Sequence, residues 1–117
     1  MANTFKVVTF AAEPNSAGTP YTIYTAAGST TTIVLGLILT NIHTAQVTAT
    51  LRLVSDTANR AVDNDAANGT AVLLNTAPIP VGSSLELLAG NKVVLETTDQ
   101  LTIDCSVADK LSGALSI

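Results

Sequence analysis

Short apolar runs separated by turn-forming residues divide this 117-residue chain and limit what it can fold into. The clearest stretch is residues 77–107, which read APIPVGSSLELLAGNKVVLETTDQLTIDCSV. Its apolar runs, residues 85–88, 92–96 and 101–107, are too short for helices, and Gly, Pro, Asn and Asp stand between them. This spacing predicts three short strands that are joined by tight turns.

The rest of the chain has the same character. Six further runs have strand composition: residues 4–10, 21–25, 30–41, 45–54, 71–76 and 111–117. Closely spaced strands without a convincing helix predict an all-β fold. We expect a single β-sandwich of jelly-roll or Greek-key type with about eight or nine short strands. Residues 1–20 are expected to form an N-terminal arm or edge strand and a loop, and residues 21–117 the sandwich core.

Residues 30–41, TTTIVLGLILTN, form the most apolar run. As one strand, this run places Leu35, Leu37 and Leu39 on one face and further apolar residues on the other, which predicts burial on both faces. One face would then meet the core, and the other a neighbouring subunit or an overlying loop. Gly36 indicates a bulge or a close backbone approach. A buried helix is the alternative, and the preceding threonines and the β-branched content argue against it.

Residues 45–54 show the clearest alternation of apolar and polar residues. Val47, Ala49, Leu51 and Leu53 are predicted to point inward, and the intervening Thr48, Thr50 and Arg52 toward water. With residues 30–41, this segment predicts a hairpin. The longest polar stretch, residues 55–70, follows and is too long for a hairpin turn.

The composition indicates assembly. Hydrophobic residues make up 47% of the chain and charged residues 12%, which is about half the usual charged share. A folded monomer usually keeps a more highly charged surface. We therefore expect copies of this chain or a partner to cover part of its surface. A neutral monomer coated with threonine is the alternative.

Charge and hydropathy argue against two classes of partner. The net charge is −4, and the five basic residues are scattered, so no phosphate-binding stripe and no nucleic-acid partner are expected. No apolar run approaches the roughly 18 residues that span a bilayer, so no membrane partner is expected. The N-terminal residues lack the apolar segment of a signal peptide, and we expect a chain that is made and kept in a cytosol.

Residues for catalysis are scarce. His43 is the single histidine and stands in a turn, and Cys105, the single cysteine, occupies an apolar position where a buried thiol is expected. No nucleophilic set, phosphate loop or zinc motif occurs. We therefore predict neither enzyme activity nor a cofactor.

Acidic residues form two candidate sites. Carboxylates on or beside strands can act in glycoside hydrolysis, but no aromatic platform accompanies them here, so they are interpreted as solvated strand faces and turn caps: Glu86, Glu96, Asp99 and Asp104. Asp63 and Asp65, in DNDAANG, offer oxygen ligands for Ca²⁺. Their spacing misses the EF-hand pattern, so a surface loop is favoured and these two residues remain weak metal candidates.

An ordered set of short motifs spans much of the chain. Residues 78–87 read PIPVGSSLEL, and they are followed by KVVLE at residues 92–96 and DQL at residues 99–101. Earlier, ILTN at residues 38–41 leads into VTATL at residues 47–51. This ordered set resembles that of a class of small tailed-bacteriophage virion proteins, and the resemblance covers roughly residues 32–117.

This resemblance implies a β-rich part of the virion without enzyme activity. The nearest example is a capsid decoration (cement) protein, often a homotrimer, that binds the major capsid protein on the capsid surface and is made in the host cytoplasm. Candidate contact elements are residues 2–10, 11–20 and 55–70. The alternatives are a small tail or head-fibre component for adsorption and, less favoured, a calcium-dependent carbohydrate-binding module centred on Asp63 and Asp65.

Overall fold

The computed structural model describes residues 5–55, 70–87, 93–96 and 98–117. These residues contain no helix and form ten strands: β1 (Val7–Glu13), β2 (Tyr21–Thr25), β3 (Thr32–Val34), β4 (Gly36–Asn41), β5 (Val47–Val54), β6 (Ala71–Ile79), β7 (Ser84–Leu87), β8 (Val93–Leu95), β9 (Gln100–Cys105) and β10 (Leu111–Ser116). The predicted all-β class is confirmed.

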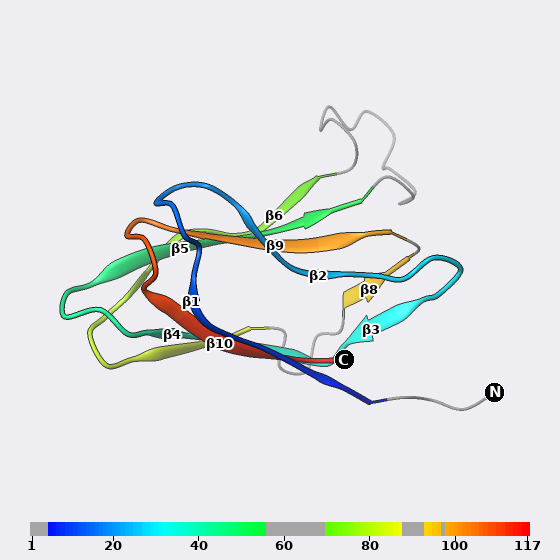
Figure 1. The fold of residues 1–117 in the computed structure, drawn as a ribbon, viewed down its shortest axis with the longest axis horizontal. Coiled ribbons are helices and arrows are strands. Elements are labelled where there is room, and N and C mark those ends of the chain that lie inside the picture. Colours follow the sequence, from blue (N-terminus) through cyan, green and yellow to red (C-terminus); the bar gives the residue numbers. More distant parts are fainter. Residues whose placement is uncertain (1–4, 56–69, 88–92, 97) are drawn as a thin grey trace.

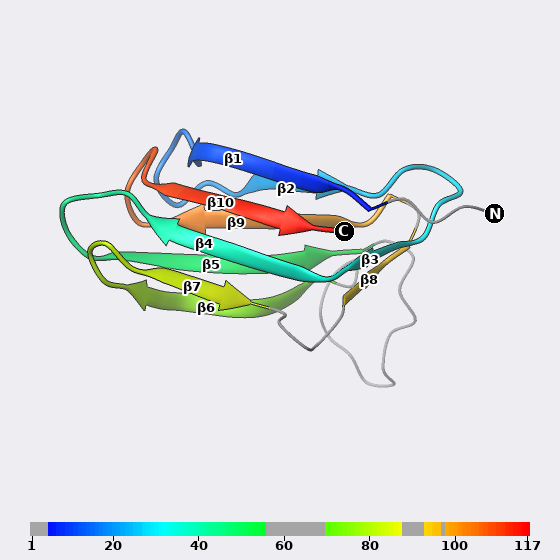
Figure 2. The ribbon, with the colours of Figure 1, turned by 90° about the horizontal axis from the view of Figure 1, so that it is seen from below.

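Two four-stranded antiparallel sheets lie face to face (Figure 1). The first sheet has the order β1-β10-β4-β7, and the second has the order β2-β9-β5-β6. Figure 2 shows the first sheet from its outer side, with the second sheet behind it. A small sheet of β3 and β8 lies at one end (Figure 1). The predicted sandwich is confirmed in this arrangement of two layers.

Aliphatic side chains from both sheets fill the space between the layers. In β5, Val47, Ala49 and Leu51 are at most 1% exposed, as the alternation predicts. They meet residues of the first sheet such as Leu37 and Leu39 in one hydrophobic cluster. The many branched aliphatic side chains compensate for the scarcity of aromatic ones, because packing needs volume rather than a particular residue type.

The prediction that Thr50 points toward water is wrong. Its side chain was expected in water, but the residue is only 2% exposed. Its Oγ1 accepts a hydrogen bond of 3.0 Å from the backbone N–H of Thr76, which belongs to β6. The neighbouring strand therefore covers the outward side of β5 at this point, and an alternation pattern contains no information on such a neighbour.

The apolar run of residues 30–41 forms two strands, so the prediction of a single strand with Leu35, Leu37 and Leu39 on one face is wrong. The chain breaks at Leu35, so the alternation restarts and Val34 and Leu37 are both buried. Leu35 and Ile38 are instead 38% and 41% exposed in the isolated chain. The break also explains why ten strands occur where about eight or nine were expected.

The expected hairpin of residues 30–54 is also wrong, because β4 and β5 belong to different sheets. Asn41, which is 3% exposed, holds this crossing between the layers. Its Nδ2 donates to the carbonyl oxygens of Ile79 at 2.9 Å and Ala45 at 3.0 Å, and its Oδ1 accepts from the backbone N–H of His43 at 2.7 Å. The three strands β7, β8 and β9 likewise enter three different sheets.

A close backbone approach occurs at Gly113 and not at Gly36. A Cβ added at Gly36 would meet nothing within 4 Å, so that interpretation of Gly36 is wrong. At Gly113 an added Cβ would lie 2.7 Å from Cζ of Phe10 and would overlap the carbonyl oxygen of Ile38. Gly113 therefore leaves the space in which the ring of Phe10 packs against β10.

Candidate interaction surface

The candidate metal and catalytic residues do not form a site in the described part of the chain. Asp63 and Asp65 lie outside the described residues. Within residues 5–55, 70–87, 93–96 and 98–117, no group of three or more His, Cys, Asp or Glu side chains could hold a metal ion. Cys105 is fully buried, as expected, and His43 is half-buried.

Two of the four acidic strand residues, Asp99 and Asp104, have separate structural roles. Asp104 forms an ion pair with Arg52, at 2.6 Å between Oδ2 and Nη1. Asp99 is 2% exposed and closes the turn before β9, because its Oδ2 accepts from the backbone N–H of Glu96 at 2.9 Å. Its Oδ1 accepts from Oγ of Ser55 at 2.8 Å. Asp99 is therefore a turn cap, as the sequence predicts.

The outer face of the first sheet is flat and nearly uncharged. One row of paired residues crosses all four strands, and it consists of Thr9, Ala114, Ile38 and Glu86. The outward positions, taken from the registers and the alternation, are Val7, Thr9, Gly36, Ile38, Thr40, Ser84, Glu86, Ser112, Ala114 and Ser116. Glu86 is the single charged residue among them, and the others are hydroxyl, small or aliphatic residues, so this face carries little charge.

A shallow hollow of about 240 Å³ lies on this face. Among the described residues it is lined by Leu35, Gly36, Leu37, Ile38, Glu86, Leu87, Ala114 and Ser116. The side chains of Gly36, Ala114 and Ser116 are too small to fill the space between the larger ones. The hollow is therefore a consequence of residue size on adjacent strands β10 and β4.

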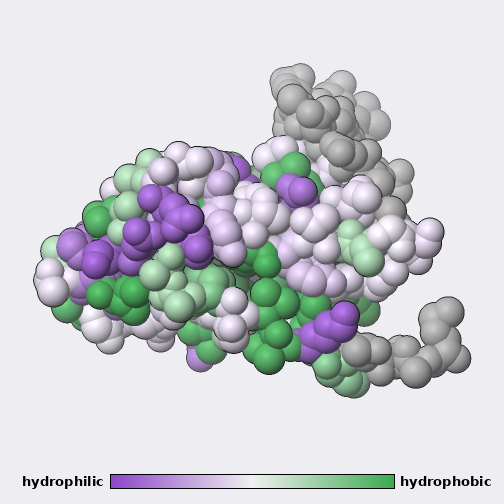
Figure 3. Space-filling view, viewed as in Figure 1, coloured by the Kyte–Doolittle hydropathy of each residue, from purple (hydrophilic) through white to green (hydrophobic). Residues whose placement is uncertain are grey.

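Further apolar side chains are exposed before and on β1 and on the small sheet of β3 and β8. Phe5 is 77% exposed and Val7 66% exposed, and both lie on the outward side of the chain that forms β1. Ile33 and Val94, which face each other across β3 and β8, are 47% and 51% exposed. Figure 3 shows hydrophobic surface over β1 and β10, close to the N-terminal end of β1. Such a cluster is typical of a contact surface.

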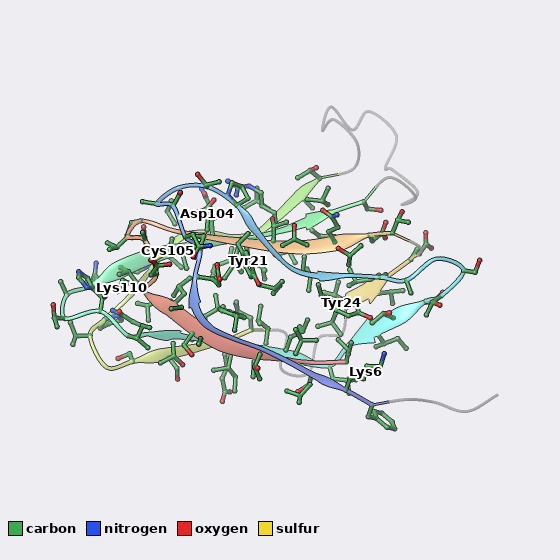
Figure 4. The ribbon with its side chains drawn as sticks, viewed as in Figure 1. Lys6, Tyr21, Tyr24, Asp104, Cys105 and Lys110 are labelled. Carbon is green, nitrogen blue, oxygen red and sulfur yellow. The ribbon has the colours of Figure 1, made fainter. Side chains whose placement is uncertain are left out.

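The outer face of the second sheet is polar. Its central row consists of Thr22, Thr102, Arg52 and Val72, and the ion pair of Arg52 and Asp104 lies on it. Figure 4 places Asp104 on β9 and shows Lys6 and Lys110 at opposite ends of the molecule. The described basic residues therefore form no continuous stripe for a polyanion.

Comparisons with known proteins identify no relative of this chain. No protein-family model, no curated protein and no solved structure matches it. Among the described residues, no helix is of the length and hydropathy that a membrane crossing requires. The functional argument therefore depends on the surface itself and on the resemblance of the sequence motifs.

Sequence reasoning located only part of this surface. It assigned one side of residues 30–41 to a neighbour or a loop, and Ile38 belongs to that side. It did not associate Val7, Ala114 and Glu86 with Ile38, because they come from three other strands. The available signal was the small, uncharged composition of alternate residues in 111–117.

Proposed function

We propose that this chain is a structural protein of a bacteriophage particle, a decoration protein that binds the capsid surface and stabilises contacts between major capsid protein subunits. The observation that carries the proposal is the nearly uncharged outer face of the first sheet, with exposed Ile38, Val7 and Phe5. A surface of this kind supports binding to other proteins. The motif resemblance supplies the phage context.

The strand order gives further support. The chain passes from β1 in the first sheet to β2 in the second, and then through β4, β5, β6, β7, β9 and β10, with β5 and β6 the one neighbouring pair in the same sheet. We interpret this order as a jelly roll, in which two Greek keys build two facing sheets. Jelly rolls are frequent in viral capsid and lectin domains. The fold is therefore suited to a virion component, although a fold does not by itself define a function.

The mechanism follows from contact area and copy number. Packaged DNA strains a capsid at the junctions between its subunits. A rigid sandwich that buries about 1,000 Å² or more can hold such a junction closed. Because many copies act on one particle, a modest affinity of each copy is sufficient. No group on the protein needs to react.

Binding to heads that lack this chain tests the proposal. We expect the purified chain to sediment with such heads, to raise the temperature at which they release DNA, and to appear on the head surface by electron cryo-microscopy. Ile38→Lys should weaken binding, because it places a charge on the apolar face. Thr22→Lys, on the outer face of the second sheet, is the matched control and should bind as the unmodified chain does.

The same experiment separates the alternatives. Density for the chain along the tail, with none on the head, would replace the decoration proposal by an adsorption component. A rise in melting temperature with added Ca²⁺ would instead favour a calcium-dependent module, because a ligand that binds only the native state stabilises it.

A further inference from the structure

We propose that the outer face of the first sheet binds a second copy of this chain, with the Phe5 side chain of one copy in the hollow of the other. This inference goes beyond the proposed function, because it concerns the purified chain and needs no capsid. The face is the one that the proposed function assigns to the capsid, so self-association and capsid binding compete for it. It rests on three features of the face: a protruding group, a receiving hollow and a match of charge.

The protruding group is the segment before β1. Lys6 is held to the sheet by two backbone hydrogen bonds with Ile117, of 2.9 and 3.0 Å. Phe5 stands immediately beyond this anchor, and 77% of it is exposed. A phenylalanine side chain buries about 150–250 Å² when it is covered, so this exposure is costly unless a partner covers the ring. The anchored backbone already fixes the position from which the ring projects.

The receiving hollow suits an aromatic ring. Its volume of about 240 Å³ is below the ~300–1,000 Å³ of ordinary small-molecule sites. It exceeds the roughly 150 Å³ of an apolar cavity that binds benzene. The exposed side chains of Leu35 and Ile38 supply its apolar walls, and Ala114 and Gly36 leave its centre open. A single phenyl ring therefore fits the size and the chemistry of this hollow.

The charges of the two parts are opposite. Glu86 is the charged residue among those that line the hollow, and Lys6 follows Phe5 directly. Lys6 is exposed, and Figure 4 shows it at the N-terminal end of β1. When Phe5 enters the hollow of another copy, the long side chain of Lys6 can reach Glu86 of that copy. A partner protein would have to supply this basic group separately.

The area of the face also suits a second copy. Four strands about 4.8 Å apart and four to seven residues long, at about 3.3 Å per residue, cover on the order of 400 Å². The Phe5 side chain adds about 150–250 Å². With Ile33 and Val94 beside the face, the contact approaches the roughly 800 Å² per partner of a stable interface. Since each copy carries both parts of the contact on one face, a two-fold pair of copies would make the contact twice.

Sedimentation velocity of the purified chain across a wide range of concentrations tests the inference. We expect the unmodified chain to self-associate. Phe5→Ala should raise the dissociation constant about tenfold or more, because the ring is the largest group that becomes buried. Ala114→Phe should do the same by filling the hollow from within its own chain. Val81→Ser, which alters an apolar residue that is 55% exposed in the turn before β7, is the control and should change nothing.

A charge exchange tests the predicted pairing of residues. Lys6→Glu and Glu86→Lys should each weaken self-association, by about fivefold for an exposed pair. In a mixed pair, the acidic arm of the Lys6→Glu variant meets the basic hollow of the Glu86→Lys variant. The other contact of that pair joins the unmodified Lys6 and Glu86, so both contacts are attractive. We therefore expect the mixture to associate more tightly than either variant alone, and we expect added salt to reduce the difference.

Three results would overturn the inference. They are a monomer at every concentration, self-association that Phe5→Ala and Ala114→Phe leave unchanged, and a mixture of the charge variants no tighter than its components. A melting curve of each variant shows whether it is folded, and Phe5→Ala affects a residue too exposed to hold the fold. A chain that self-associates but ignores phage heads even when it is diluted to monomers would contradict the proposed function alone, and a chain that binds heads but stays monomeric at every concentration would contradict this inference alone.

Discussion

The two outer faces of the sandwich differ in the residues that form their central rows. The central row of the second sheet contains Arg52, whose charge is paired with Asp104 on the neighbouring strand. The central row of the first sheet contains Ile38 and Ala114, which no described side chain covers fully. One face thus has a charged pair at its centre, and the other has small and apolar residues there. The difference shows that shared architecture does not give two sheets the same surface.

The largest expected effect separates the inner and outer sides of β4. Leu39→Ala should lower the free energy of unfolding by about 2–5 kcal/mol, because Leu39 is fully buried and leaves a cavity. Ile38→Ala, one residue away and 41% exposed, should cost about 1 kcal/mol or less in a dilute monomer. Chemical denaturation of both variants measures the difference. Equal losses would show that Ile38 is already covered within the chain.

The next effect concerns the close approach inside the first sheet. Gly113→Ala should cost about 1–3 kcal/mol, because its Cβ would meet the backbone of Ile38 and the ring of Phe10. Gly36→Ala, where an added Cβ meets nothing within 4 Å, is the matched control and should cost less than about 1 kcal/mol. Thermal unfolding compares the two. A Gly113→Ala variant as stable as the unmodified chain would contradict the described packing.

Two threonines on the second sheet sharpen the comparison further. Thr50→Val should cost about 1 kcal/mol, because the backbone N–H of Thr76 loses its acceptor. Thr102 is 6% exposed, and its Oγ1 has no hydrogen-bond partner among the described residues. Thr102→Val should therefore be neutral or should stabilise the protein by up to about 1 kcal/mol. The denaturation midpoints of both variants test this difference. A larger loss of stability for Thr102→Val than for Thr50→Val would contradict the hydrogen bonding described for these two side chains.

The smallest effect belongs to the ion pair on the second sheet. The side chains of Arg52 and Asp104 are 31% and 15% exposed, so water screens part of their attraction. A double-mutant cycle with Arg52→Met and Asp104→Asn should give a coupling of about 1 kcal/mol or less, decreasing with added salt. A coupling that salt does not change would show that the pair is more deeply covered than its exposure indicates.

Much of the fold follows from local residue patterns. The bounds of β2 match the predicted run of residues 21–25, because Tyr-Thr-Ile-Tyr-Thr alternates between clear loops. The inward side of β5 was also predictable, since alternation fixes which residues share a face. The turn before β9 was predictable from Asp99, whose carboxylate caps it. These features depend on neighbours in the sequence only.

The candidate surface was less predictable, because it depends on which strands are paired. Ile38 was expected to face a neighbour or a loop, but its partners Ala114 and Glu86 are distant in the sequence. The break between β3 and β4 at Leu35 was also missed, because no turn-forming residue precedes it in this apolar run. Asp63 and Asp65 lie outside the described residues, and the calcium hypothesis for them stays a prediction.

The sequence by itself determined an all-β chain, the inward residues of its alternating strands and the lack of a recognisable catalytic motif. The tertiary structure decided which strand joined which sheet, and it thereby separated β4 from β5 and gathered the uncharged residues of four strands on one face. The physical reason is the separation along the sequence over which each kind of interaction acts. Alternation and turn chemistry act between residues a few positions apart, whereas strand pairing depends on contacts between distant segments that compete for the same sheet edge.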